Sequence, residues 1–179
     1  MKMSQVKRSI LTAACIALCV VLPMAFHAIP NAGSILSPMH IPVLLCGLLC
    51  GGAYGLLCGL AGPLLSSLLT SMPPMAYLPP MMVELAVYGL VAGILMNYIR
   101  TNKLMVDVYL SLIPAMLIGR IIAGAAKALI FAPGAFTMAA WISSYFVTAL
   151  PGIILQLVLV PAVLIALEKS GLIPPRYQK

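Results

Sequence analysis

Residues 31–54 read NAGSILSPMHIPVLLCGLLCGGAY, in which an uncharged loop runs into a strongly apolar segment. Asn, Gly, Ser and Pro in the first part are typical of a loop. The apolar run that starts at His40 and ends before the Gly51-Gly52 pair predicts a short helix over residues 40–50. The sequence thus places the imidazole of His40 where a loop meets a membrane-embedded helix.

The composition is that of an integral membrane protein. Of the 179 residues, 63% are hydrophobic and only 7% are charged, and the mean hydropathy is +1.15. Soluble domains carry about 25% charged residues. A membrane-spanning helix needs roughly 20 apolar residues, so the chain has room for about six or seven spans with short loops between them. No room is left for a soluble catalytic domain.

The order of apolar runs and loops predicts an all-α membrane protein, a single domain over residues 1–179 with six transmembrane helices. We expect these helices over residues 9–28, 40–50, 53–70, 80–99, 104–131 and 141–167. The first run follows three basic residues, as in a signal peptide. It is long and has no convincing small-residue cleavage site, so we expect it to be retained as a helix. Pro151 and Pro161 are expected to kink the last helix.

Small residues predict where helices pack closely. Gly47, Gly51, Gly55 and Gly59 recur every four residues and would form a smooth stripe, unless the turn at Gly51-Gly52 interrupts it. Five cysteines also lie in apolar segments, and we interpret them as small packing residues rather than metal ligands. They are Cys15, Cys19, Cys46, Cys50 and Cys58.

Loop charges predict the orientation of the bundle in the membrane. Eight of the ten basic residues lie in the N-terminal segment, in the turn after residue 99 or in the C-terminal tail; they are Lys2, Lys7, Arg8, Arg100, Lys103, Lys169, Arg176 and Lys179. The loops over residues 29–39, 71–79 and 133–140 have no Lys or Arg. Because basic loops stay in the cytoplasm, we expect both termini to be cytoplasmic and these three loops to lie outside.

Three ionisable residues lie deep inside apolar segments, namely Glu84, Arg120 and Lys127. A charge at the bilayer centre costs about 2.5–3.5 kcal/mol on insertion scales, so such residues usually face the bundle interior or a cavity. Arg120 and Lys127 are seven residues apart, about two helical turns, and therefore share a face. Asp107 differs from them, since it lies near the inner end of its helix where headgroup water is expected to reach it.

The buried charges can serve to hold helices together or to bind a ligand, and the two roles are compatible. Glu84 can form a salt bridge to Arg120 or Lys127, and its neighbour Tyr88 lies on the same face four residues later. Alternatively, the surplus of one positive charge favours a ligand with one carboxylate, which Arg holds through two parallel hydrogen bonds. A fixed Glu84 would then orient the Arg that binds the ligand. We expect His40, Glu84, Tyr88, Arg120 and Lys127 to converge on one small-molecule site.

Loop residues add weaker candidates for this site. Tyr77 and Trp141 fall in or beside outer loops, where they form either an interfacial aromatic belt or a lid over the ligand. Asn31 in the first outer loop is a candidate polar contact. We expect no metal site, because the only other histidine is His27 and no acidic or thiolate partner stands at ligand spacing from His40.

Catalytic motifs are missing from the sequence. It has no HExxH, no Gly-rich nucleotide loop with its Lys, and no Ser, His and Asp in the order of a triad. We therefore expect no enzyme and no cofactor. A stand-alone channel or proton-coupled carrier stays open as a second reading, because intramembrane Glu, Arg and Lys can form a proton relay.

Several stretches together resemble one family. They are Ala13-x-x-x-Ala17, residues 37–44 (SPMHIPVL) and residues 66–88, especially residues 84–89 (ELAVYG). With six helices and uncharged outer loops, the whole chain resembles the substrate-binding S components of energy-coupling factor (ECF) vitamin transporters, in the general group that includes pantothenate-type members.

This resemblance implies a function and a set of partners. An S component in the plasma membrane of a prokaryote binds a vitamin under the outer loops after the first, third and fifth helices. It docks on a membrane-embedded coupling protein through a helix face that would here carry Ala13 and Ala17. Two cytoplasmic ATPases hydrolyse the ATP. Pantothenate is the first expected substrate, since it has one carboxylate and polar hydroxyls, and pyridoxine-type compounds and hydroxymethylpyrimidine are the alternatives.

Overall fold

The computed structural model describes residues 3–26, 32–134 and 136–177, and all regular structure within them is helical. The elements are α1 (Gln5–Ala25), α2 (Ala32–Leu36), α3 (His40–Cys50), α4 (Gly52–Thr70), α5 (Leu78–Tyr98), α6 (Leu104–Ala126), the π-helix η1 (Lys127–Phe131), α7 (Met138–Ile142), the π-helix η2 (Ser143–Val147) and α8 (Leu150–Lys169). The prediction of an all-α fold is confirmed.

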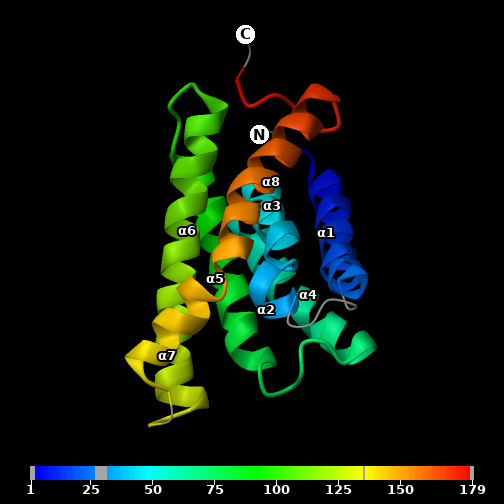
Figure 1. The fold of residues 1–179 in the computed structure, drawn as a ribbon. Coiled ribbons are helices and arrows are strands. Elements are labelled where there is room, and N and C mark those ends of the chain that lie inside the picture. Colours follow the sequence, from blue (N-terminus) through cyan, green and yellow to red (C-terminus); the bar gives the residue numbers. More distant parts are fainter. Residues whose placement is uncertain (1–2, 27–31, 135, 178–179) are drawn as a thin grey trace.

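The long helices form an upright bundle in which successive helices alternate in direction (Figure 1). Helices α1, α4 and α6 run away from the upper end of the view, and α3, α5 and α8 return to it. We call the upper end, where α1 begins and α8 ends, the basic end, because six basic residues lie there on the described segments. They are Lys7, Arg8, Arg100, Lys103, Lys169 and Arg176. The opposite end, which carries residues 71–77 and 132–134, is called the loop end.

Five helices of the described chain are long and apolar enough to cross a membrane, so the chain is a multi-pass membrane protein. The helix α3 is also apolar, but it has only 11 residues and is shorter than these five. A helix of that length rises only about 16 Å, and every residue in it except Ile41 is buried. Being apolar on all sides, α3 forms the centre of the core, where it packs on α1, α4 and α5. Its bounds are those predicted.

Glycine lets α4 lie directly against α5. A methyl group added at Gly55 would overlap the backbone of Gly89, and one added at Gly89 would overlap the backbone of Gly55. Gly47 of α3 also faces Gly89. Gly51 ends α3 with a φ of 100°, a conformation that suits glycine. The predicted stripe is therefore divided between two helices, both of which pack on α5.

Replacing Gly89 with alanine is expected to lower the melting temperature of the protein in detergent. The added methyl group has no free space, and overpacking of a core costs about 1–3 kcal/mol. Gly33→Ala provides a matched control, because a Cβ at Gly33 meets no atom within 4 Å. Equal melting temperatures for the two variants, measured by circular dichroism, would contradict the close packing of α4 on α5.

The first helix begins earlier than predicted. It starts at Gln5 rather than at residue 9, because Ser4 caps it: the Ser4 hydroxyl accepts a hydrogen bond of 3.3 Å from the amide of Lys7. Its last helical residue is Ala25, and the predicted end at residue 28 lies outside the described residues. Within the segment predicted as loop, residues 32–36 form the short helix α2.

The last predicted helix, over residues 141–167, is wrong as a single element. The chain forms α7 and η2 over residues 138–147 and starts again as α8 at Leu150. Pro151 lies in the first turn of α8, where its missing amide hydrogen is tolerated, whereas inside a continuous helix its ring would clash with the preceding turn. Pro161 lies inside α8. The break separates η2 from α8.

The C-terminal segment closes the basic end over Asp107. The expectation that water reaches this residue is wrong, since Asp107 is 0% exposed. Arg176 donates from Nε to Oδ2 of Asp107 at 2.7 Å, and from Nη2 to the carbonyls of Met96 and Ile99. Thr101 donates to the other carboxylate oxygen at 2.7 Å. The buried charge is thus paired by a residue 69 positions further along the chain.

Candidate functional site

His40, Glu84, Tyr88 and Arg120 come together between α3, α5 and α6. The Tyr88 hydroxyl donates to Oε1 of Glu84 at 2.9 Å, and Arg120 Nε donates to the Tyr88 hydroxyl at 2.7 Å. Oε1 of Glu84 also lies 3.7 Å from Arg120 Nε and 3.5 Å from His40 Nε2. The ring of His40 meets the ring of Tyr88 edge-on, with centroids 5.3 Å apart. The four side chains therefore form one connected polar network.

Local packing explains why these side chains meet. Glu84 and Tyr88 are four residues apart on α5 and so share a face. Gly119 on α6 leaves room for the ring of Tyr88, which a Cβ at that position would overlap. His40 begins α3, which lies at the centre of the bundle. All four residues are buried, with exposed fractions of 0–8%, so the charge of Glu84 depends on Arg120 as its partner.

The guanidinium of Arg120 keeps donors free. Only its Nε has a hydrogen-bond partner among the described residues, so both terminal nitrogens are available. Its central carbon lies 5.7 Å from the ring centroid of Phe146. A planar fork of two N–H groups in this position can recognise a carboxylate, a carbonyl or a ring nitrogen of a ligand.

A cavity of about 560 Å³ lies at the loop end, within the range usual for small-molecule sites. His40, Glu84 and Arg120 line it together with Lys127 and Tyr77. Its remaining lining residues come from α1 and the residue after it, from α2 and the loop after it, from the Pro-rich segment before α5 and the start of that helix, and from η2 and the residues after it. They are Pro23, Phe26, Gly33, Ser37, Pro38, Met39, Met72, Pro73, Pro74, Pro80, Met81, Ser144, Tyr145, Thr148 and Ala149.

Lys127 stands apart from the polar network. No carboxylate of the described chain lies within 4 Å of its ammonium group, so the predicted salt bridge of Glu84 goes to Arg120. The Lys127 ammonium lies instead 4.5 Å from the ring centroid of Phe136 and 5.8 Å from that of Tyr77. These rings come from two different loops and hold the ammonium in the cavity wall through cation–π contacts.

Of the candidate ligand contacts predicted in or beside the outer loops, one lines the cavity and another does not. Tyr77 is 60% exposed and lines the cavity. Trp141 does not line it: its indole N–H donates to the carbonyl of Arg120 at 3.1 Å, and its ring lies against Gly124 and meets Phe146 edge-on. Trp141 therefore supports the helix that carries Arg120. Asn31 lies outside the described residues.

The two alanines predicted to dock a partner are exposed. Ala13 and Ala17 lie on the outward face of α1, whereas Cys15 and Cys19 of the same helix are buried in the core. The outward face is open to another helix, and small residues at this spacing allow close approach.

Hydroxyl groups of the cavity wall were missed from the sequence. Ser144 and Thr148 lie four residues apart on the segment that precedes Pro151, and Ser37 precedes α3. The spacing of Ser144 and Thr148 is a signal for one shared helix face, but the segment reads as an ordinary membrane helix until its break is known. These hydroxyls add neutral hydrogen-bonding groups beside the charged ones.

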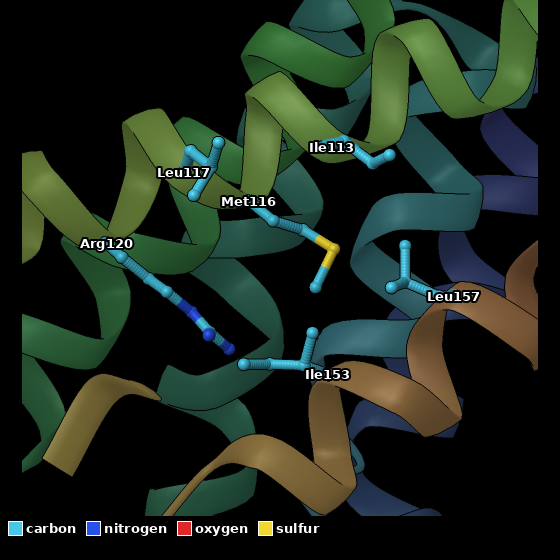
Figure 2. A pocket seen from close by; sticks show the side chains of 6 residues that line it. All are labelled: Ile113, Met116, Leu117, Arg120, Ile153 and Leu157. Carbon is cyan, nitrogen blue, oxygen red and sulfur yellow. The ribbon is translucent and has the colours of Figure 1, made fainter. Parts of the chain in front are cut away.

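A second, smaller cavity of about 70 Å³ separates α6 from α8 (Figure 2). Ile113, Met116 and Leu117 of α6 line it with Ile153 and Leu157 of α8, and Arg120 lies at one end. Arg120 therefore lines both cavities. The small one is too apolar and too small to hold a polar ligand by itself.

The comparisons with known proteins identify the family. Residues 7–164 match the family model described as ECF transporter, substrate-specific component. Searches of curated proteins and of solved structures give no match. The family match covers most of the chain, and five apolar helices fit a transporter subunit of the membrane. Such components serve the uptake of vitamins or related micronutrients through an ECF module. The resemblance seen in the sequence is confirmed, and the chain belongs to the substrate-specific S components of ECF transporters.

Proposed function

We propose that this chain is the high-affinity binding subunit for one small water-soluble vitamin with a single carboxylate, pantothenate being the first candidate. The observation that carries the proposal is the cavity of about 560 Å³ in which two cations, Arg120 and Lys127, face one anion, Glu84. One negative charge on the ligand would leave the site neutral. In a low-dielectric interior, an unbalanced charge is costly and a balanced set is favoured.

The other groups of the cavity suit a ligand with hydroxyl or amide groups. Ser37, Ser144 and Thr148 offer hydroxyls, and Tyr145 adds a phenol. Met72 and Met81 with the neighbouring prolines provide an apolar wall against which aliphatic carbons of the ligand pack. Pantothenate combines these features: a carboxylate, an amide, two hydroxyls and a branched aliphatic centre.

The proposal includes the orientation in the membrane. With six crossings, the loop end and its cavity face outward, and the basic end with both termini faces the cytoplasm of a prokaryote. Support comes from the six basic residues described at the basic end, since basic segments are retained in the cytoplasm. The exposed Ala13 and Ala17 on α1 would dock the membrane-embedded coupling protein, and two cytoplasmic ATPases would energise the cycle.

Mass spectrometry of small molecules released from gently solubilised protein tests the substrate. A single vitamin with a carboxylate, present at about one per protein as tight one-site binding requires, is the expected result. A protein purified in parallel with Arg120→Gln and Lys127→Gln should release none. A neutral vitamin, such as a pyridoxine-type compound or hydroxymethylpyrimidine, would contradict the charge argument while keeping the family assignment.

If no molecule is released, calorimetric titration decides among the candidates. Pantothenate, pyridoxine and hydroxymethylpyrimidine are titrated separately into the same preparation. Saturable binding of pantothenate alone supports the proposal, and binding of either neutral compound alone contradicts it. Uptake of pantothenate by cells that lack every ECF ATPase would instead support a stand-alone proton-coupled carrier.

A further inference from the structure

We infer that the two cations of the cavity bind opposite ends of the ligand: Lys127 binds the carboxylate near the loop end, and Arg120 with Glu84 and His40 binds a neutral, hydrogen-bonding end deeper in the bundle. The inference rests on the proposed function and adds to it the direction in which the ligand lies. It also separates the charge-selecting residue from the residue that holds the rest of the molecule.

The first argument is that the positive charge of Arg120 already has a partner. Oε1 of Glu84 lies 3.7 Å from Arg120 Nε, and Tyr88 bridges the two through hydrogen bonds of 2.9 and 2.7 Å. A ligand carboxylate placed on Arg120 would therefore lie beside the carboxylate of Glu84. Two like charges at such distances repel each other strongly in a buried site.

The second argument is that the charge of Lys127 has only aromatic partners. Its ammonium lies against Phe136 and Tyr77, and no carboxylate of the described segments is within 4 Å. Ring faces stabilise a cation but leave its formal charge uncompensated. An ammonium group has three donors, and rings do not occupy them as an oxygen does. A carboxylate is the ligand group that completes this site.

The third argument is distance. Lys127 follows Arg120 by seven residues, which places the two Cα atoms about 10 Å apart along a helix. The ammonium of Lys127 lies against Phe136 and Tyr77, whereas the guanidinium of Arg120 lies against Phe146. The two cations thus have different surroundings, which favours a ligand that presents a different group to each.

The deep end suits a neutral group that both donates and accepts hydrogen bonds. The terminal nitrogens of Arg120 are donors without partners in the described chain, and the Glu84 carboxylate beside them is an acceptor. His40 contributes an imidazole to the same wall. Hydroxyl and amide groups match such a mixed set, because each can accept from Arg120 and donate to Glu84.

A matched pair of ligands tests the assignment. Pantothenate and pantothenol are the probes, since they differ only in that a carboxylate is replaced by a hydroxymethyl group. Their affinities are measured by isothermal titration calorimetry on the full-length protein. The wild type is expected to prefer the acid by about tenfold or more, the contribution of one hydrogen bond between charged groups.

Variants of the protein then show which residue causes the preference for pantothenate over pantothenol. Lys127→Met should remove the preference for the acid, because it weakens the binding of pantothenate much more than the binding of pantothenol. The remaining binding of pantothenol shows that the variant is folded. Lys127→Arg should keep the preference, because it keeps the charge. Lys169→Met, which removes an exposed lysine at the basic end, serves as the matched control and should behave as the wild type. Arg120→Gln should weaken the binding of both compounds by a similar factor.

The outcomes separate this inference from the proposed function. Acid preference that survives in Lys127→Met and disappears in Arg120→Gln would overturn the inference, while the proposed substrate class would stand. A wild-type protein that binds neither compound would overturn the proposed substrate and the inference with it. Preference lost only in the Lys127→Met protein supports both.

Discussion

Arg120→Met protein is expected to lose both ligand binding and much of its stability. The substitution removes the charge that Glu84 faces at 3.7 Å and the donor that binds Tyr88. Breaking one partner of a buried ion pair costs about 3–5 kcal/mol, because the other charge is left without compensation. Unfolding followed by circular dichroism in one detergent, together with calorimetric titration, measures both losses.

A double-mutant cycle shows whether the charge itself is responsible. Glu84→Gln removes the negative charge with little change of shape, so the double variant with Arg120→Met carries no unpaired charge. Its free energy of unfolding should lie closer to the wild type than that of Arg120→Met alone, although ligand binding stays lost. Purely additive effects of the two substitutions would refute the coupling between Glu84 and Arg120.

Arg176→Ala should destabilise the opposite end of the bundle by a similar amount. The guanidinium, whose side chain is only 6% exposed, is the partner of the fully buried Asp107. It also donates to the carbonyls of Met96, in the last turn of α5, and of Ile99, which follows α5. Its loss leaves a buried carboxylate with Thr101 and Tyr177 as its remaining partners. We expect a loss of about 3–5 kcal/mol in the free energy of unfolding.

Arg100 provides the matched control at the same end. It is an exposed arginine beside the same turn, and exposed ion pairs contribute only about 0–1 kcal/mol. Arg100→Ala should therefore unfold at nearly the wild-type denaturant concentration. Arg176→Lys should rescue only part of the loss, because a single ammonium lacks the planar fork that reaches Asp107 and two carbonyls at once. Equal stability of Arg176→Ala and Arg100→Ala would contradict this role.

The sequence predicted the elements whose signals are local. The helix over residues 40–50 has its predicted bounds, because a Pro-rich loop precedes it and two glycines follow it. The break before α8 has no such local signal. The residues on both sides of it are apolar, so the sequence predicts one helix that Pro151 kinks, whereas the structure has two elements, η2 and α8. Apolar sequence alone does not distinguish a kinked helix from two helices.

In the candidate site too, contacts within one helix could be predicted from the sequence, whereas contacts between helices could not. Glu84 and Tyr88 lie on one helix, so their shared face followed from spacing. The choice of Arg120 over Lys127 as the partner of Glu84 depends on how α5 packs against α6, and Asp107 finds its partner 69 residues away. Neither pairing has a sequence signal. Trp141 was a candidate for ligand contact, but its indole binds the backbone of Arg120 instead.

This placement of Trp141 has a practical consequence. It is the one tryptophan in the sequence, and its indole is hydrogen-bonded to the residue that lines the cavity. The protein therefore carries an intrinsic fluorophore beside its proposed recognition site, with no background emission from other indoles. Occupancy could be followed as a change of emission in micelles, in nanodiscs or during docking to a transport complex, without attaching a dye to the chain.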